Sequence, residues 1–411
     1  MAPIDSTRAA RRAHSRLRVR RQRRRVALAA LAAIVLIAVL AAKGGSSESG
    51  GHHHNAAAHA PVVVDGGPLA PLSVGGLAAL WAPQNVVGTQ PGTAAAYEAA
   101  SKRGGPGGYI LIADRGNNRI LVVSPSGQVV FLYPSSEDLR RGRRLVYNDD
   151  TFVAPGGAEL IANEEDNHAI VSVRLSDHNL SVLFGHPGEQ GTDSTHLNTP
   201  DDAYVLPDGS FTVADAYNCR ILFIAQGRIL REYGHSAVCR HEPPGYLGAV
   251  NGDTPVPGGG VLVSEINGSW IDEIGPDGRL AFAVQAPVGY PSDPQPLPGG
   301  RILLADYSNP GSIIIMDQLG HVLWRYRPTE GYDRLDHPSL AMPLPNGNIA
   351  VNDDYRHRVV VIDPRSNKIV WQYGHTDAPG TAPGYLNTPD GMDFVPYGPH
   401  GGPDYAAVVH P

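Results

Sequence analysis

The stretch of sequence that decides the fold runs from His196 to His235 and reads HLNTPDDAYVLPDGSFTVADAYNCRILFIAQGRILREYGH. It contains four short apolar runs separated by turn residues, at 203–206, 210–214, 220–225 and 228–233. Pro207-Asp208-Gly209 predicts a tight turn, because Pro fixes φ, Asp bonds nearby backbone and Gly accepts a positive φ. The stretch therefore predicts four antiparallel strands joined as a meander. Such a sheet cannot bury both faces alone, so it needs neighbours of its own kind.

Five further segments repeat the second strand and the turn that follows it. The six copies begin at Ile112, Ile161, Val213, Val263, Leu304 and Val351. Two positions later each copy carries an acid or an amide, at Asp114, Asn163, Asp215, Glu265, Asp306 and Asp353, with spacings of 41 to 52 residues. A four-stranded unit repeated at this spacing is typical of a radial β-propeller. The sequence therefore predicts an all-β protein with six blades.

The first copy has no matching first strand before it, and the missing strand lies at the other end of the chain. Residues 385–394 read YLNTPDGMDF and closely repeat the start of the template. We predict that this C-terminal strand completes the N-terminal blade and closes the ring, so that no sheet edge stays unpaired. Residues 405–409 would add one more strand if the ring held a seventh, partial blade.

The N-terminal segment predicts a membrane anchor. Residues 1–25 hold ten Arg and one acid, Asp5, and an unbroken apolar run follows over 26–42. The run is near the lower limit for crossing a bilayer, and the Arg cluster predicts a cytoplasmic N-terminus. We expect a single-pass signal anchor at the cell membrane, a flexible linker rich in Gly, Ala and Pro over 43–107, and an extracytoplasmic propeller over 108–411. The alternative is a cleaved signal peptide and a secreted protein.

The charge of the exported part narrows the class of partner. The chain of 411 residues has a formal charge of −7. Residues 1–25 contain ten of the 33 basic and one of the 40 acidic residues, so the remainder carries a formal charge of −16. An acidic domain of this kind is a poor candidate for binding nucleic acid or anionic lipid. Cations, sugars and neutral small molecules fit it better.

Polar residues recur where each blade enters its first strand, the strand that lines the channel of a propeller. Alignment on the P-D-G turn makes six positions equivalent: Asp149, Asp201, Asn251, Ser292, Ser339 and Asp390. Further acids follow one or two positions later: Asp150, Asp202, Asp293 and Asp253. We expect these side chains at the channel mouth, where carboxylates, amides and hydroxyls would suit Ca²⁺ or Mg²⁺. The alternative is that they cap turns and serve structure alone.

Histidines also recur at one place in the repeat. Gly185-His186, Gly234-His235 and Gly374-His375 share a position in the loops that connect blades, and His337 precedes the first strand of another blade. Imidazoles around one funnel could coordinate Zn²⁺ or act as acid and base. The alternative is that each ring packs on a neighbour in its own loop. Ca²⁺ and Zn²⁺ are thus the candidate ions, and no cofactor is certain.

The two cysteines lie on the same predicted face. Cys219 follows a second strand, and Cys239 lies in the next loop between blades. In an oxidising compartment two such thiols are expected to form a disulfide. Two free buried thiols are the alternative.

The copies resemble NHL-type repeats, whose pattern combines N-x-P, P-D-G and A-D-x-x-N-x-R. The matching segments are 374–389, 185–220 and 113–119, and the resemblance covers about residues 108–396. Residues 362–371, with Ile362-Asp363-Pro364 and Ile369-Val370-Trp371, also resemble extracytoplasmic propellers of the quinone-cofactor-like and arylsulfotransferase-like kind. These resemblances imply a six-bladed fold and leave the reaction open.

Two function classes follow from these features. The first is a membrane-tethered binding module that takes a small molecule or a protein partner on its funnel face. The second is a metal-dependent hydrolase or lyase, similar in layout to the gluconolactonase and amidating-lyase propellers. The sequence lacks G-x-S-x-G, H-E-x-x-H and Walker motifs, so whether the protein is an enzyme stays open. A quinone-cofactor dehydrogenase is disfavoured because the chain has only four Trp.

Overall fold

The computed structural model describes residues 104–410. The predicted basic tail (1–25), the membrane span (26–42) and all but the last four residues of the predicted linker (43–107) lie outside the described residues. Within 104–410, no helix is both long enough and apolar enough to span a membrane.

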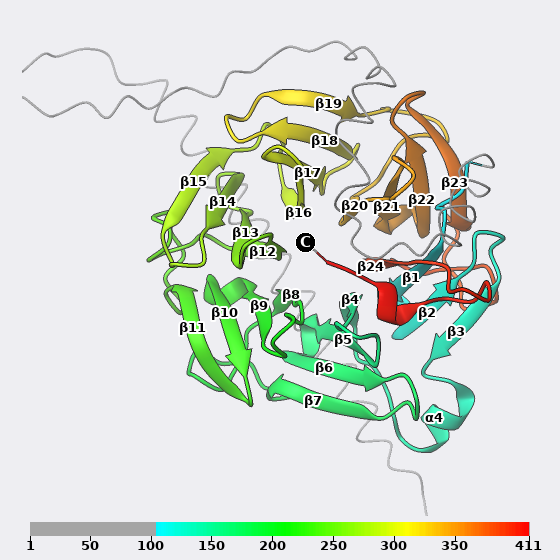
Figure 1. Ribbon diagram of the computed structural model, residues 1–411, viewed down its shortest axis with the longest axis horizontal. Coiled ribbons are helices and arrows are strands. Elements are labelled where there is room, and N and C mark those ends of the chain that lie inside the picture. Colours follow the sequence, from blue (N-terminus) through cyan, green and yellow to red (C-terminus); the bar gives the residue numbers. More distant parts are fainter. Residues whose placement is uncertain (1–103, 411) are drawn as a thin grey trace, which may run out of the picture. The chain divides into compact units, whose positions relative to one another are not determined.

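Six four-stranded antiparallel sheets surround a common centre, so the predicted six-bladed propeller is confirmed (Figure 1). In blades 2 to 6 the strands follow each other in sequence order from the centre outward. Blade 2 contains β4 (Asn148–Val153), β5 (Glu159–Glu164), β6 (Ala169–Arg174) and β7 (Leu180–Gly185). Blade 3 contains β8 (Pro200–Asp202), β9 (Phe211–Asp215), β10 (Arg220–Ala225) and β11 (Arg228–Gly234).

The remaining blades are built in the same way. Blade 4 contains β12 (Val250–Val256), β13 (Gly260–Glu265), β14 (Trp270–Ile274) and β15 (Leu280–Gln285). Blade 5 contains β16 (Pro291–Leu297), β17 (Arg301–Asp306), β18 (Ser312–Asp317) and β19 (Val322–Tyr326). Blade 6 contains β20 (Ala341–Pro343), β21 (Ile349–Asp353), β22 (Arg358–Asp363) and β23 (Lys368–Gly374). A short helix, α4 (Ser136–Arg140), lies between blades 1 and 2, where Ser135 and Asp138 form a capping box.

Blade 1 is shared between the two ends of the propeller, as the sequence predicts. It contains β1 (Tyr109–Asp114), β2 (Arg119–Val123) and β3 (Val129–Tyr133), and its innermost strand is β24 (Met392–Val395). β24 pairs antiparallel with β1, with Tyr109 opposite Val395 and Ile112 opposite Met392. Pairing across this seam leaves no open sheet edge at the closure.

The chain after β24 does not form the strand considered for residues 405–409. It forms a single 3-10 turn instead, η6 (Tyr405–Ala407), and the described residues contain six sheets. From η6 the chain runs toward the centre of the ring (Figure 1). The alternative of a seventh, partial blade is therefore wrong, because this segment leaves the rim and enters the channel.

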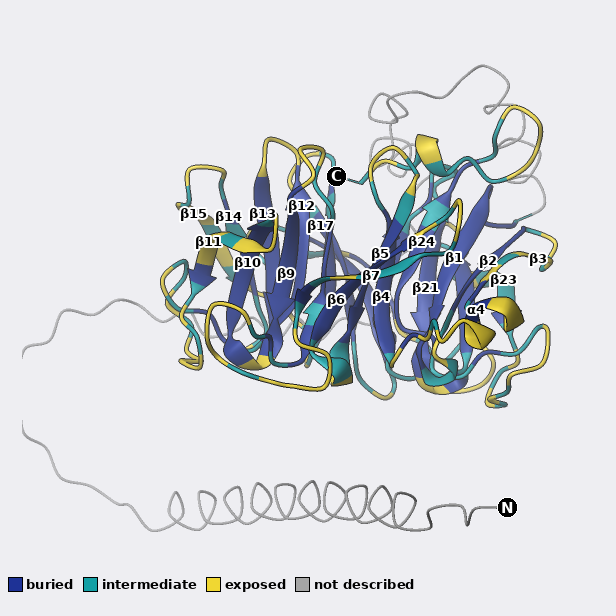
Figure 2. Cartoon of the chain, turned by 90° about the horizontal axis from the view of Figure 1, so that it is seen from below, coloured by how far each residue is buried: buried dark blue, intermediate teal, exposed yellow. Residues whose placement is uncertain are grey.

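Apolar side chains pack between neighbouring blades and form the core. Each blade interface has its own buried set, such as Leu303 and Val351 between blades 5 and 6, or Ile221 and Val261 between blades 3 and 4. The three inner strands of each blade are buried along most of their length, whereas exposed residues gather in the loops and on outermost strands such as β11 and β15 (Figure 2). Each buried Ile, Leu or Val stabilises the fold by about 1.5–3 kcal/mol relative to exposure, so the ring is stable only when closed.

A network of Asp, Asn and Arg fixes the loops between blades. In blade 3, Asp215 at the end of β9 accepts from Asn218 Nδ2 and Arg220 Nε, both at 2.8 Å. The same Asp-Arg pair recurs in blades 1 and 6. In blade 2 the acid at the strand end is Glu164, one residue beyond the Asn163 that the sequence alignment selects. Glu164 is the equivalent residue because the acid at the end of each second strand lies opposite the first residue of the third strand, which is Ala169 in blade 2.

Candidate functional site

The innermost strand of every blade carries a polar residue at or just before its start. In chain order these residues are Asp149, Asp201, Asn251, Ser292, Ser339 and Asp390. In blades 2 to 5 the pairing to the second strand shifts directly after this point. Such β-bulges re-aim side chains and are common beside functional sites. The bulge brings a second carboxyl to the channel in several blades, for example Asp150 in blade 2 and Asp202 in blade 3.

These acids are buried inside the channel, near the end at which the inner strands begin, and we call this end the acidic mouth. Asp150 and Asp293 are at most 3% exposed, and Asp202 and Asp253 are fully buried. They act on one another across the ring: burial raises the pKa of Asp293 well above its usual value, and the carboxyls of Asp150 and Asp202 raise it further. Asp201 is half-buried, so it is the acid of this set that lies nearest to solvent. The expected ring of polar groups is thus set inside the channel.

Arg115 is a member of the candidate site that the sequence alignment does not select. It lies in η2 (Arg115–Asn117), the turn after β1, and its guanidinium forms ion pairs with Asp149 and Asp390. It also lies 3.5 Å from Asp354 Oδ2 and 3.6 Å from Glu165 Oε2. Glu165 and Asp354 occupy the same repeat position in blades 2 and 6. Arg115 occupies this same position in blade 1, so one repeat position carries opposite charges in different blades. This pattern is the sequence signal that could have located the cluster.

Two blades meet at a pair of carboxyls deeper in the channel. Burial raises the pKa of Asp202, on β8, to about 7, although the backbone N–H of Ala203 stabilises its charged form. Burial and the Asp202 carboxyl raise the pKa of Asp253, on β12, well above its usual range. A carboxyl with a pKa near neutrality can both accept and donate a proton at physiological pH. The pair is therefore a candidate acid-base group.

The far end of the channel is occupied by the C-terminal segment. His410 Nε2 lies 2.9 Å from Asp393 Oδ2, and the imidazole packs edge-on against Phe152 and Tyr204 at 5.6 Å from each ring. Burial alone would lower the pKa of His410, but the Asp393 carboxylate outweighs it and raises the pKa. Asp390 precedes β24 and Asp393 lies within it, so Asp393 is deeper in the channel than Asp390. His410, which contacts Asp393, therefore closes the end opposite the acidic mouth.

Aromatic side chains line one side of that mouth. Tyr290 and Tyr307 of blade 5 contact edge to face at 5.1 Å, and Tyr307 contacts His337 at 5.0 Å. His337 also meets Tyr355 of blade 6 at 4.6 Å. Burial, Asp201 and Asp293 raise the pKa of Tyr290, which places this phenol beside the channel acids. We call Tyr290, Tyr307, His337 and Tyr355 the aromatic rim.

The four histidines selected from the sequence do not converge. His186 stacks on His196 at 4.1 Å, His375 stacks on Tyr385 at 4.0 Å, and His235 meets Tyr246 edge-on at 5.7 Å. Each of these rings packs within its own blade-connecting loop, while His337 belongs to the aromatic rim. Within residues 104–410, none of the four joins a group of three metal-ligating side chains.

The glycine before each of these three histidines is needed by the backbone. Gly234 ends β11 with a φ of +84°, and a Cβ there would lie 2.3 Å from the carbonyl oxygen of Cys219. Gly185 and Gly374 are in the same situation. The repeated Gly-His pair thus marks a close approach of two loops, and the histidine follows as a packing residue.

Cys219 and Cys239 form a disulfide, with their Cα atoms 5.2 Å apart. It connects the turn after β9 in blade 3 to the loop that leads into blade 4. The bond therefore fixes the connection between two neighbouring blades on the face that carries the acidic mouth.

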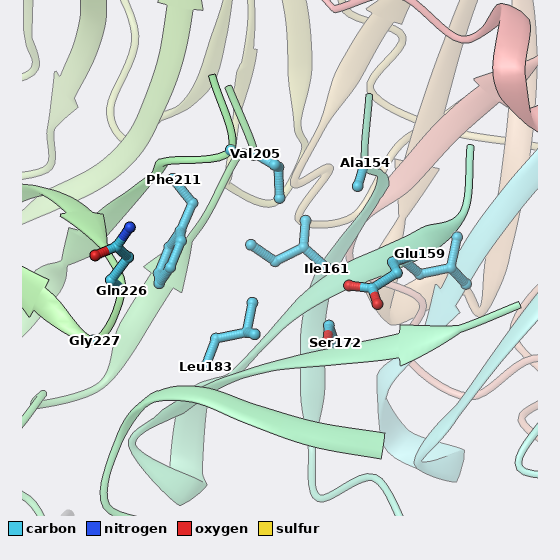
Figure 3. A pocket seen from close by; sticks show the side chains of 11 residues that line it. Ala154, Glu159, Ile161, Ser172, Leu183, Val205, Phe211, Gln226 and Gly227 are labelled. Carbon is cyan, nitrogen blue, oxygen red and sulfur yellow. The ribbon is translucent and has the colours of Figure 1, made fainter. Parts of the chain in front are cut away.

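A small apolar cleft of 240 Å³ lies between blades 2 and 3 on the opposite face (Figure 3). Ile161, Leu183, Val205 and Phe211 line it, with the polar side chain of Gln226 at one side. The turns that border it connect first to second strands, which places it away from the acidic mouth.

Comparison with known proteins leaves the function open. The sequence matches no family model, and no curated protein matches it. Among solved structures, a protein of unknown function from Bacteroides caccae is 17% identical with a TM-score of 0.48, covering 69% of this chain and 97% of its own. A virginiamycin B lyase from Staphylococcus aureus is 17% identical with a TM-score of 0.39, covering 55% and 69%. A chain of a nidogen/laminin complex is 13% identical with a TM-score of 0.47, covering 69% and 97%. With TM-scores below 0.5, these similarities carry no functional argument.

Proposed function

We propose that the protein is a membrane-tethered, extracytoplasmic propeller that binds an organic cation at the acidic mouth of its channel. The observation that carries this proposal is the excess of acid there. Nine carboxyls line the channel and its mouth: Asp149, Asp150, Asp201, Asp202, Asp253, Asp293, Asp354, Asp390 and Asp393. Two basic side chains contact this set, Arg115 and His410. Burial and mutual repulsion raise the pKa of most of these carboxyls, so a cation that enters the channel would be bound together with the release of protons.

The aromatic rim favours an organic cation over a bare ion. A positive charge above the face of Tyr gains about 0.5–1 kcal/mol at an exposed site. Tyr355 is 49% exposed, and Tyr290 and Tyr307 are half-buried beside it, so their rings are open to a ligand that enters the mouth. Asp201, the half-buried acid, faces the same space. Burial and the carboxyls of Glu165 and Asp390 raise its pKa, and an ammonium group beside it would favour its charged form again.

The location outside the cytoplasm rests on two features. The Cys219–Cys239 disulfide supports an oxidising compartment, since such bonds are rare in the reducing cytoplasm. The Arg-rich segment 1–25 and the apolar run 26–42 support an anchor whose N-terminus stays inside.

The Asp-Arg pairs at the ends of β1, β9 and β21 support blades of the NHL type.

Calorimetric titration of the full chain in detergent tests the proposed site. Choline should bind, and its uncharged carbon isostere should not, because the site recognises the positive charge. Asp201→Asn should weaken choline binding more than Tyr355→Ala, for which we expect a loss of about two- to fivefold. Asp277→Asn is the matched control, since Asp277 is 60% exposed in a turn on the opposite face.

The proposal fails if choline and its isostere bind alike, or if Asp201→Asn binds choline as the wild type does. Binding of Ca²⁺ without binding of choline would favour the second candidate function, a metal-dependent hydrolase or lyase. That candidate is favoured by Asp202, whose pKa of about 7 suits a general acid or base. It predicts Ca²⁺-dependent cleavage of an ester or lactone that Asp202→Asn abolishes.

A further inference from the structure

Blade 4 departs from its neighbours at the acid that ends the second strand. In blades 1, 3 and 6 this acid is an Asp paired with the Arg that begins the third strand. In blade 4 the acid is Glu265, and the paired position on β14 holds Trp270. Glu265 is fully buried, and no donor reaches its Oε1 in the described part of the chain. The charge compensation by arginine that blades 1, 3 and 6 share is thus missing in blade 4.

A second acid makes this departure larger. Asp272, two residues into β14, occupies a position that is apolar in the other five blades: Leu121, Val171, Leu222, Ile314 and Val360. Asp272 is fully buried, and no donor from another residue reaches its oxygens among residues 104–410. Burial and the neighbouring Glu265 carboxyl raise the pKa of Asp272 to about 9. Two neighbouring buried carboxyls are costly unless a cation or protons compensate them.

A histidine completes the cluster from the loop that leads into blade 4. His241 Nδ1 lies 3.1 Å from Glu265 Oε2 and 3.7 Å from Asp272 Oδ2, and one ligand atom from each residue falls within 4.8 Å of the others. Two ligands bound about 2.1 Å from one Zn²⁺ at a tetrahedral angle stand about 3.4 Å apart, which these distances bracket. The imidazole is held by stacking on Trp270, with ring centres 3.9 Å apart and planes at 6°.

The loop that carries His241 is itself fixed. Cys239, two residues earlier, is bound to Cys219 of blade 3. Arg240 lies over the ring of Tyr246 at 3.7 Å, and Glu242 and Tyr246 exchange backbone hydrogen bonds. Gly248 leaves room for the carboxylate, because a Cβ there would lie 2.7 Å from Glu265 Oε2. A site built on fixed elements keeps its ligands in place before the metal arrives.

We propose that His241, Glu265 and Asp272 bind a divalent transition-metal ion of the Zn²⁺ class. An imidazole with two carboxylates suits such an ion better than Ca²⁺, which takes oxygen ligands. Three protein ligands leave a fourth position open, and the side chain of His241 is 21% exposed, so an ion can reach the cluster from the surface. The site lies in blade 4, and it is independent of the proposed function of the channel.

The key variant is Asp272→Leu, which restores the apolar residue found at this position in blades 1 and 3. It is expected to fold, because it removes a buried acid and adds an apolar side chain. His241→Ala removes the imidazole ligand. The matched control is His235→Ala, since His235 lies in the same loop and packs on Tyr246 away from the two acids.

Metal content after dialysis against Zn²⁺, together with titration by Zn²⁺ and Co²⁺, tests the proposal on the full chain. His52, His53, His54 and His59 lie outside the described residues and are present in every variant, so the difference between variants reports on blade 4. We expect Asp272→Leu and His241→Ala to bind one equivalent less than wild type and His235→Ala to bind the same amount. Zn²⁺ should raise the Tm of wild type more than that of folded Asp272→Leu. Equal metal content in wild type and Asp272→Leu would overturn the proposal.

Discussion

Blades 3 and 4 have the same four strands but treat their buried acids in opposite ways. In blade 3 the guanidinium of Arg220, 2% exposed, bonds Asp215 and donates to two carbonyl oxygens of the preceding loop. In blade 4 the aromatic ring of Trp270 stands at that position, and the imidazole of His241 lies upon it. The comparison teaches that an arginine at this position closes the buried acid into a structural ion pair, whereas an aromatic residue there, with a second acid at Asp272, leaves the acid available to another partner.

Removal of that arginine is expected to have the largest effect. Arg220→Leu should lower the free energy of unfolding by about 3–5 kcal/mol, because it leaves the Asp215 carboxylate buried without a counter-ion. Denaturant unfolding followed by circular dichroism measures it. The control Arg279→Ala removes an arginine that is 88% exposed and should change stability by less than about 0.5 kcal/mol. A similarly small effect of both variants would mean that blade 3 does not depend on its ion pair.

The disulfide between the two blades comes next. Replacement of Cys219 and Cys239 together by Ala opens a loop closed over a sequence separation of 20 residues. We expect a loss of about 3 kcal/mol in unfolding free energy. The same double variant should weaken Zn²⁺ binding in blade 4, since the loop that carries His241 loses its attachment. Unchanged metal affinity would show that Trp270 alone positions the imidazole.

The smallest expected effect lies where the inner strands of the same two blades meet, at Asp202 and Asp253. The folded pKa of Asp202 is about 7, against 3.8 for a free Asp, so the folded state holds the proton more tightly. Stability should therefore fall as pH rises from about 4 to about 7. Asp202→Asn should reduce the loss of unfolding free energy over this pH range by about 1–2 kcal/mol. The reduction is only part of the whole pH effect, because neighbouring carboxyls titrate together with Asp202. Parallel slopes for wild type and variant in unfolding experiments across this range would contradict the assignment.

Much of the fold was predictable because characteristic turn residues mark the ends of the strands in each repeat. Pro207-Asp208-Gly209 defines the hairpin between β8 and β9, and the copy at 385–394 predicts the seam between β24 and β1. The runs at 210–214 and 220–225 match β9 and β10 within one residue, whereas β8 (Pro200–Asp202) ends before the run predicted at 203–206 begins. That strand starts with polar residues, so apolar periodicity could not locate its beginning.

The candidate site was only partly predictable. The channel acids follow from the alignment, but Arg115 sits in a 3-10 turn, where no periodicity shows which way a side chain points. Repetition also misled, since a histidine that follows a required glycine recurs for reasons of backbone space. The blade 4 cluster depends on Trp270 and Asp272, two single departures from the repeat. Departures of this kind carry information only once the strand register is known.

The seam in blade 1 sets the order in which the chain must be completed. β1 forms near the start of the propeller, but its inner partner, beginning at Met392, is made almost last. Until then the hydrogen-bonding edge of β1 is open, and such an edge can recruit another strand. A chain interrupted before Met392 would have five complete blades and a first blade whose strand β1 keeps an unpaired edge. The propeller is therefore expected to be aggregation-prone until the last residues are made, and to lose this open edge in a single late step.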